Sequence, residues 1–276
     1  MPIISSLYIY PVKALQGIAL PTATLTTQGL AFDRHWMLVD ANGQFVTQRQ
    51  LPELARIRTH LTDKHLILDH AHRAPLTINL AEIPENRCTV VVWNDTCLAC
   101  DEGAQATQWL QSVTGRDDLR LVRFAPESVR PVDAAYMDGA SADTEFSDGY
   151  PFLVVSEASL KALNAQLQAN GANPVPMTRF RPNIVINGVE AWGENACKTL
   201  TAADSAYRLA TRKPCQRCKV TTVDQQTGLI DNPKEPLRTL AAMNPYPDLS
   251  GAYFGQNATL SSGDGAVISV GDVLIA

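Results

Sequence analysis

The sequence predicts a mainly β protein with a few helices (α+β), arranged in two lobes that meet near residue 125. Many short segments alternate apolar and polar residues with a period of two and are rich in β-branched residues, which is typical of strands. Between 126 and 149 this periodicity is lost in a stretch rich in Asp, Pro, Gly and Ser, as in a linker or a functional loop. We therefore expect one domain at 1–125 and a second at 126–276.

The first lobe is expected to consist mostly of strands. Asn42-Gly43 is a strong hairpin signal, because a type I′ turn needs positive φ at both central residues. A helix is predicted at 101–114, where apolar residues share one face and Gly115 can end it. The expected strands of this lobe are 3–10, 18–26, 32–40, 44–49, 56–62, 65–69, 75–80, 88–93 and 119–124.

The second lobe is expected to mix strands with two helices. One helix is predicted at 157–169, with Ser156 as its N-cap, and a short one near 235–243. The expected strands are 151–155, 183–187, 206–211, 218–224, 257–261 and 266–275.

Composition excludes several classes of protein. With 276 residues, of which 45% are hydrophobic, the chain can bury a substantial core. A net charge of −5 argues against a surface that binds nucleic acid over its whole extent. No run approaches the roughly 18 apolar residues of a membrane helix, and the N-terminus has no signal-peptide pattern. We expect a cytoplasmic protein with neither a nucleic-acid nor a membrane partner.

The segment from Arg212 to Lys219 has the most unusual chemistry in the sequence. Four cations flank Cys215 and Cys218, and neighbouring cations favour the thiolate form of cysteine. A thiolate is a nucleophile and a soft metal ligand, and the same cations would attract a phosphate or an anionic oxo-metal group. Ordinary buried cysteines beside solvated charges would give the same pattern.

Three more specific interpretations of these cysteines compete. A thioredoxin-like site needs a helix after the CxxC pair, whereas the following residues resemble a strand. A zinc site could take four sulfurs from Cys97/Cys100 and Cys215/Cys218, but these pairs lie much further apart than the roughly 15–20 residues of compact zinc motifs. A single thiolate that holds a metal whose other ligands belong to a cofactor stays open.

Further basic and polar residues lie at the ends of predicted strands or loops. Each has an ordinary alternative, such as a solvated lysine or an arginine paired with a nearby carboxylate. Together they would supply cations and polar groups from both lobes, as a bulky anionic cofactor requires. These residues are Lys13, Asp33-Arg34, Asp148-Gly149-Tyr150, Arg181 and Asn183.

Eight stretches, in order over nearly the whole chain, carry a resemblance to a known family. They are YPVKALQG (10–17), FDRHWMLVD (32–40), VTQRQLPELA (46–55), DGYPFLVVSEASL (148–160), FRPNIVING (180–188), CQRCKVTTVDQQTG (215–228), KEPLRTL (234–240) and FGQN (254–257). The sequence resembles the MOSC-domain proteins, in particular the mitochondrial amidoxime-reducing component and its bacterial relatives.

This resemblance implies a MOSC N-terminal β-barrel lobe followed by a MOSC β-barrel domain, with molybdenum cofactor (Mo-molybdopterin) bound between them. It assigns Cys218 as the metal ligand and a catalytic residue, with Cys215 as a neighbour. Asp148 is the second expected catalytic residue, which would hydrogen-bond the substrate or relay a proton. Pyridoxal phosphate binding is a further property implied at the level of the family. The implied cofactor-binding residues are Lys13, Arg34, Asp148, Gly149, Tyr150, Arg181, Asn183, Gln216 and Arg217.

The implied activity is the reduction of small N-hydroxylated compounds, such as hydroxylamines, amidoximes or N-hydroxylated bases. The sequence shows no electron-transfer module, so we expect a separate electron donor: a ferredoxin, a flavodoxin or a flavin reductase. The alternative is a non-catalytic carrier that binds the molybdenum cofactor and transfers it to another protein.

Overall fold

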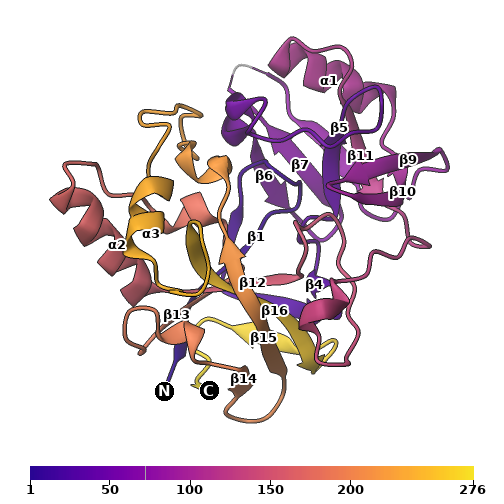
Figure 1. Ribbon diagram of the computed structural model, residues 1–276. Helices are drawn as coiled ribbons and strands as arrows, with labels where there is room; N and C mark the ends of the chain where they lie inside the picture. The colour runs from indigo at the N-terminus through magenta and orange to yellow at the C-terminus, as the bar shows by residue number, and fades with distance from the viewer. Residues whose placement is uncertain (72) are drawn as a thin grey trace.

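Strands dominate the computed structural model, which describes residues 1–71 and 73–276. The largest sheet has eight strands (Figure 1). In pairing order they are β18 (Leu274–Ile275), β14 (Thr199–Ala202), β15 (Arg208–Gln216), β16 (Tyr253–Ser262), β12 (Phe152–Ser156), β13 (Ile184–Asn187), β1 (Ile3–Ile9) and β2 (Ile18–Leu20). Within it β12 and β13 pair in parallel, and the other neighbours are antiparallel. The predicted class, mainly β with a few helices, is confirmed.

Three smaller sheets complete the strands. The first has the order β5 (Trp36–Val39), β11 (Arg120–Phe124), β10 (Asp95–Asp101) and β9 (Arg87–Val92). The second has the order β6 (Arg58–Leu61), β7 (His65–Asp69) and β8 (Leu76–Asn79). The third has the order β17 (Val267–Ser269), β3 (Thr22–Thr26) and β4 (Gly29–Leu30). The first two of these sheets and helix α1 (Ala104–Thr114) form the upper lobe in Figure 1.

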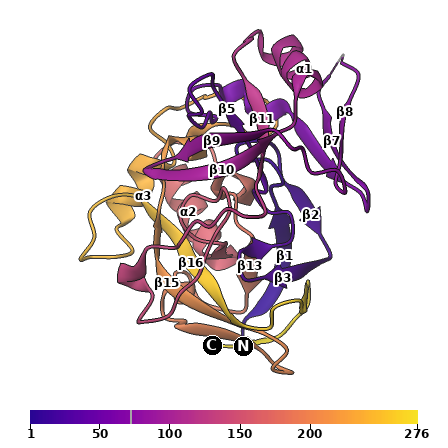
Figure 2. The same cartoon turned by 90° about the vertical axis from the view of Figure 1, so that its right-hand side faces the viewer.

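The start of the chain is built into the second lobe. Strands β1 and β2 extend the large sheet, and β3 pairs with β17 near the end of the chain. The amide of Ile4 donates to the carbonyl of Asp272 at 3.0 Å, so the two termini lie together, as both views show (Figures 1 and 2). Strands from before and after residue 125 thus share one sheet. The domain boundary at 125/126 stays a prediction.

Helix α2 (Glu157–Ala169) makes the crossover between the parallel strands β12 and β13. Its first turn is capped as predicted, because the Ser156 hydroxyl accepts from the Ser159 amide at 3.0 Å. Leu163 and Leu167 lie fully buried against the sheet in a cluster with Phe180. The short helix α3 (Leu237–Met243) joins the same cluster through Leu240. No helix of the described ranges is both long and apolar enough to cross a bilayer.

The turn at Asn42-Gly43 is not of type I′. Gly43 has a φ of +74°, but Asn42 is not among the residues with positive φ. The carboxylate of Asp40 organises the turn by accepting from the amides of Asn42 and Gln44 at 2.8 and 3.0 Å. The strand expected at 44–49 is also wrong, because pairing with β5 stops at the single bridge between Val39 and Phe45.

The strand expected at 218–224 is a 3-10 helix, η5 (Lys219–Thr222). The hydroxyls of Thr221 and Thr222 donate to the carbonyls three residues earlier, at 3.0 and 2.8 Å. These side-chain bonds to the backbone stabilise a tight turn even though the residues are β-branched.

Several other boundaries differ from those expected. Strands β10 and β14 were not predicted, and α1 begins at Ala104 because β10 continues to Asp101. The segment expected as one strand at 18–26 is divided into β2 and β3 at Pro21, which cannot donate to a strand ladder. The segment expected at 266–275 is divided into β17 and β18 around Gly271, where φ is +98°.

Gly255 allows the central strands to approach each other closely. It has a φ of +80°, and a Cβ atom there would lie 2.8 Å from the Val154 carbonyl oxygen. The register between β15 and β16 slips beside it, between Pro214 and Gln216. This irregular stretch carries the end of β15, with Cys215, and the following Cys218 to the site described below.

Gly255→Ala is therefore expected to destabilise the protein by about 2–4 kcal/mol, combining backbone strain with a steric clash. The measurement is the free energy of unfolding in urea. Gly265→Ala is the matched control, since Gly265 has a φ of +78° but nothing within 4 Å of a Cβ atom. The control should lose only about 1 kcal/mol. Equal losses in the two variants would contradict a role for close approach at Gly255.

Candidate active site

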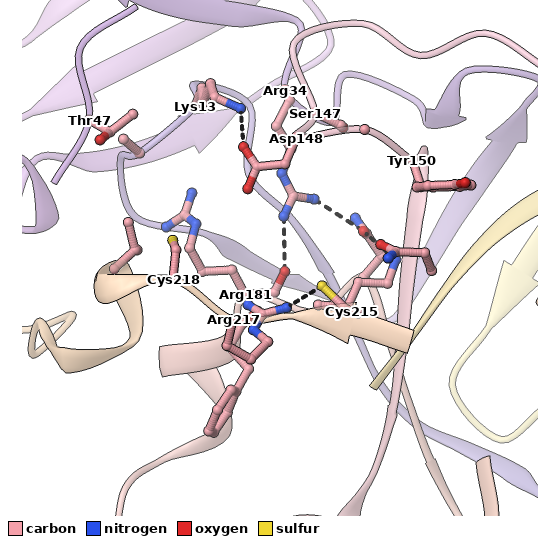
Figure 3. A pocket seen from close by; sticks show the side chains of 17 residues that line it. Lys13, Arg34, Thr47, Ser147, Asp148, Tyr150, Arg181, Cys215, Arg217 and Cys218 are labelled. Atoms are coloured by element: carbon pink, nitrogen blue, oxygen red, sulfur yellow. Dashed lines mark hydrogen bonds and ion pairs between the residues drawn. The ribbon is translucent and has the colours of Figure 1, made fainter. Parts of the chain in front are cut away.

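A cavity of about 100 Å³ lies where the end of β15 meets the 146–150 loop and residues of the first lobe (Figure 3). All the residues expected at a cofactor site line it except Gln216. Those that line it are Lys13, Arg34, Asp148, Gly149, Tyr150, Arg181, Asn183, Arg217 and Cys218. Gln216 is exposed, because alternation at the end of β15 turns its side chain away from the side of Cys215 and Arg217. The roles of these residues stay predictions.

Lys13 and Asp148 form an ion pair at the edge of the cavity. Nζ of Lys13 donates to Oδ1 of Asp148 at 2.6 Å and to the Phe146 carbonyl at 2.7 Å. The indole Nε1 of Trp93 donates to the same Oδ1 at 3.1 Å, which leaves Oδ2 without a partner among the described residues. Lys13 is 6% exposed, whereas the Asp148 side chain is 70% exposed to the cavity. Water in the cavity therefore screens this pair in part.

The surroundings of Asp148 favour its ionised form. Desolvation by the protein around the cavity opposes ionisation, but the charge and hydrogen bond of Lys13, the Trp93 indole and the charge of Arg34 outweigh it. Together they hold the pKa of Asp148 well below its ordinary value. Burial lowers the pKa of Lys13 in turn, and Asp148 partly restores it. At neutral pH Asp148 is thus a hydrogen-bond acceptor.

Two guanidinium groups enclose one buried aromatic ring. The Cζ atoms of Arg34 and Arg181 lie 4.3 and 4.1 Å from the ring centroid of Tyr10. Both arginines have a φ of +52°. Arg34 donates to Asp33 Oδ2 at 2.5 Å, which gives its charge a buried partner. Burial, with the like charge of Arg34 adding to it, lowers the pKa of Arg181 to about 10.

The arginines of the second lobe have donors that no described residue accepts. Nη2 of Arg181 and Nε of Arg217 are buried without a hydrogen-bond partner, although Arg181 Nη1 donates to the Leu15 carbonyl at 2.7 Å. A buried donor without an acceptor costs free energy, and an anionic ligand would supply the acceptor. The cavity thus has the composition of an anion site.

Asn183 lines the cavity and is hydrogen-bonded within the protein at both ends of its amide. Its Oδ1 accepts from Arg34 Nη1 and from the Leu153 amide, both at 3.1 Å, and its Nδ2 donates to the Tyr8 carbonyl at 3.3 Å. The side chain is almost fully buried and both ends of its amide are engaged. Asn183 therefore positions Arg34 and joins β1 to β12.

Both cysteines of the basic segment line the cavity, half-buried. Arg217 Nη1 donates to Cys215 Sγ at 2.8 Å. Burial raises the pKa of the Cys215 thiol, an effect that Arg217 offsets only in part. Cys218 lies at the start of η5, opposite Lys13 and Asp148 in Figure 3.

The four-cysteine zinc interpretation is wrong. Cys97 and Cys100 are buried in β10, in the first lobe. Among residues 1–71 and 73–276 no group of three or more His, Cys, Asp or Glu side chains is placed to hold a metal ion. Any metal in the cavity would therefore need ligands from a cofactor.

Sequence reasoning missed several residues of the site. Thr47 and Asn257 line the cavity, and both lie within stretches that carry the family resemblance, which was the available signal. Arg130 had no such signal, since it stands in an aperiodic loop. It is buried and donates to the Ser147 and Asp148 carbonyls at 2.5 and 3.1 Å, so it fixes the loop that presents Asp148.

Comparison with known families agrees with this geometry. The MOSC N-terminal beta barrel domain matches residues 1–117, and the MOSC domain matches residues 141–275. The chain belongs to the MOSC-domain proteins. The cavity of this MOSC protein is lined from both matched parts, by Lys13 and Arg34 from one and by Asp148 and Cys218 from the other.

Individual relatives carry two kinds of name. "Mitochondrial amidoxime-reducing component 1" of Mus musculus is 34% identical over 92% of this chain and 74% of its own length. The Homo sapiens protein of the same name is 34% identical over 86% of this chain and 70% of its own length. "Molybdenum cofactor sulfurase" of Oryza sativa subsp. japonica is 30% identical over 87% of this MOSC chain, which spans only 30% of the sulfurase.

Lys13→Met is expected to raise the pKa of Asp148, because burial alone favours the protonated carboxyl and the Lys13 charge opposes it. In the unaltered protein the carboxylate should stay ionised well below pH ~4, the ordinary aspartate value. Since the folded pKa is depressed, the stabilisation is present at neutral pH and is lost as the pH falls. The measurement is a carbon-13 NMR titration of the Asp148 carboxyl.

Lys219→Met is the matched control, because Lys219 is exposed and does not line the cavity. It should leave the Asp148 titration unchanged. An unchanged midpoint in Lys13→Met would mean that Trp93 and Arg34 suffice to hold the carboxylate ionised, against the assignment to Lys13.

Proposed function

We propose that the cavity binds molybdenum cofactor and that the protein reduces N-hydroxylated compounds with electrons from a separate donor. The observation that carries the proposal is the half-buried thiol of Cys218 in a cavity whose buried guanidinium groups have unpartnered donors. The names of the relatives point to the same cofactor and to the same class of substrate.

The residues present fit this cofactor. Its phosphate needs cations and hydrogen-bond donors, and Arg181 and Arg217 have buried donors free. Its metal needs a soft ligand, and Cys218 would supply one thiolate. Cys215 is the poorer candidate, since burial raises its pKa and Arg217 already donates to its sulfur. Pyridoxal phosphate binding is not part of this proposal, because Lys13, the lysine in the cavity, is paired with Asp148.

When bound, the cofactor would supply two-electron redox chemistry. Reduction of an amidoxime to an amidine breaks the N–O bond, consumes two electrons and two protons, and releases the oxygen as water. The electrons would come from the donor protein, for which we propose a ferredoxin, a flavodoxin or a flavin reductase.

Asp148 would orient the substrate in this reaction. Its pKa lies well below the ordinary value, so at neutral pH the carboxylate accepts hydrogen bonds and has no proton to give. Oδ1 is occupied by Lys13 and Trp93, which leaves Oδ2 to accept from an N–H or O–H group of the substrate. The two protons would then come from water in the cavity. Of the two roles expected for Asp148, hydrogen bonding to the substrate is favoured over proton relay.

Cys218→Ala is expected to abolish reduction of N-hydroxylated compounds and to remove one sulfur from the coordination of molybdenum. The protein would be produced in a cofactor-replete host, reduced chemically or by a donor protein, and measured by turnover and by X-ray absorption at the metal. Cys215→Ser is the matched control and should keep the sulfur count of the unaltered protein. Full turnover in Cys218→Ala, or loss of a sulfur only in Cys215→Ser, would overturn the assignment.

The carrier function would be favoured by a different result. A loaded protein that reduces no N-hydroxylated compound with any donor, yet activates a molybdenum-free apo-enzyme, would be a carrier. Oxidation of NADH by the purified protein and substrate alone would contradict the need for a separate donor.

A further inference from the structure

Trp93 adjoins the rim of the cavity through its hydrogen bond to Asp148, although it is not among the residues that line the cavity. It stands in the two-residue turn between β9 and β10, and its side chain is 41% exposed. Its indole N–H nevertheless has a specific partner, Oδ1 of Asp148, 55 residues further along the chain. The turn of this first-lobe hairpin therefore reaches the edge of the site.

The backbone of Trp93 is strained. Its φ is +57°, a conformation that a bulky residue rarely adopts and that glycine would adopt at no steric cost. In a two-residue hairpin with positive φ at the first central position, glycine is the usual residue there. An exposed tryptophan that bears this strain contributes nothing evident to the core, so the strain indicates a role at the site.

The hairpin is fixed to the Asp148 loop at a second point. Asp95, two residues after Trp93, accepts from Nε of Arg130 at 2.8 Å. Arg130 donates in turn to the carbonyl oxygens of Ser147 and Asp148. The hairpin is therefore joined to the Asp148 loop in two ways: Trp93 contacts the Asp148 side chain, and Asp95 is linked through Arg130 to the loop backbone.

Trp93 also belongs to a continuous aromatic and cationic surface. The guanidinium of Arg49 lies 4.3 Å from its ring centroid, and the ring of Phe45 lies 5.2 Å away at an angle of 53°. Phe45 in turn lies 5.7 Å from Nζ of Lys13, which lines the cavity. A ligand that donates a hydrogen bond to the free oxygen of Asp148 would thus meet aromatic surface beside it.

We propose that Trp93 is a specificity-determining residue, whose ring at the rim selects N-hydroxylated compounds with a flat aromatic substituent and whose N–H fixes Asp148 to receive them. This inference rests on the proposed function for its substrate class. An aromatic substituent would stack on the exposed part of the indole while its N-hydroxyamidine group donates to Asp148. An aliphatic analogue would make the second contact only.

Benzamidoxime and acetamidoxime test this, because they share the reacting group and differ in phenyl against methyl. In the cofactor-loaded protein Trp93→Gly should raise KM for benzamidoxime roughly 2- to 10-fold more than KM for acetamidoxime, the size of one aromatic pair, because both compounds lose the effect of the indole N–H on Asp148 and only benzamidoxime loses the ring contact. Glycine suits the turn, so this variant should fold.

Trp93→Phe keeps a ring and should keep much of the preference, while loss of the N–H raises the pKa of Asp148. Trp109→Phe, whose indole donates to the Ala74 carbonyl away from the cavity, is the control.

A second readout needs no cofactor and no turnover. The nitrogen-15 NMR signal of the Trp93 indole, identified by its loss in Trp93→Phe, should shift more with benzamidoxime than with the same concentration of acetamidoxime, which lacks the ring that would stack on the indole. Equal shifts, or equal KM changes for both compounds in Trp93→Gly, would overturn the inference and leave the proposed function intact. If the loaded protein reduces neither compound with any donor, the proposed function fails, and the indole signal alone then decides whether Trp93 selects aromatic ligands.

Discussion

The stack of Arg34, Tyr10 and Arg181 is the interaction on which the site depends. It brings two like charges to within 4.3 and 4.1 Å of one buried ring, from segments about 150 residues apart in the chain. Desolvation and mutual repulsion oppose this arrangement, and the lowered pKa of Arg181 records both effects. Asp33 compensates one of the charges, since it accepts from Arg34 and from the Tyr10 amide. Nη2 of Arg181 has no hydrogen-bond partner among the described residues, so an anion bound beside it would compensate the second charge.

Neutral hydrogen bonds hold this charged centre together across the two halves of the chain. Gln48 and Gln225 exchange a reciprocal pair of amide hydrogen bonds at 3.0 and 2.8 Å, both buried. Gln225 also accepts from Arg181, and Gln48 donates to the Ala14 carbonyl beside Lys13. Each satisfied amide thus fixes the backbone next to a cation. Since amides carry no net charge, they rigidify the site without neutralising it, and the cations stay available to a ligand.

Local patterning predicted those parts of the fold that depend on local forces. Alternation located β7 and β8, and the cap at Ser156 located the start of α2. Prediction from local patterning failed where side chains hydrogen-bond to nearby backbone, as at Asp40 and Thr221, because the sequence pattern does not reveal those hydrogen bonds. In the site, the sequence marked Lys13, Arg34 and Arg181 by their positions at strand or loop ends and suggested that together they bind an anionic cofactor, and the family resemblance named that cofactor. Trp93 and Arg130 could not be predicted, since their partners lie far along the chain and neither position has a distinctive pattern.

The two halves of the chain contribute different chemistry to one cavity. The thiol of Cys218 and the guanidinium donors without partners among the described residues come from the second half. The aromatic rings of Trp93 and Phe45, which contact the cavity residues Asp148 and Lys13, come from the first half. Asp148 stands between them, presented by the second half and held by Lys13 and Trp93 of the first. A change in the hairpin turn would therefore alter what reaches Asp148 while the anion site stays as it is. On the proposed function, a change in this turn would alter substrate choice without loss of the cofactor, because Trp93 hydrogen-bonds Asp148 but not Arg181, Arg217 or Cys218, which would hold the phosphate and the metal.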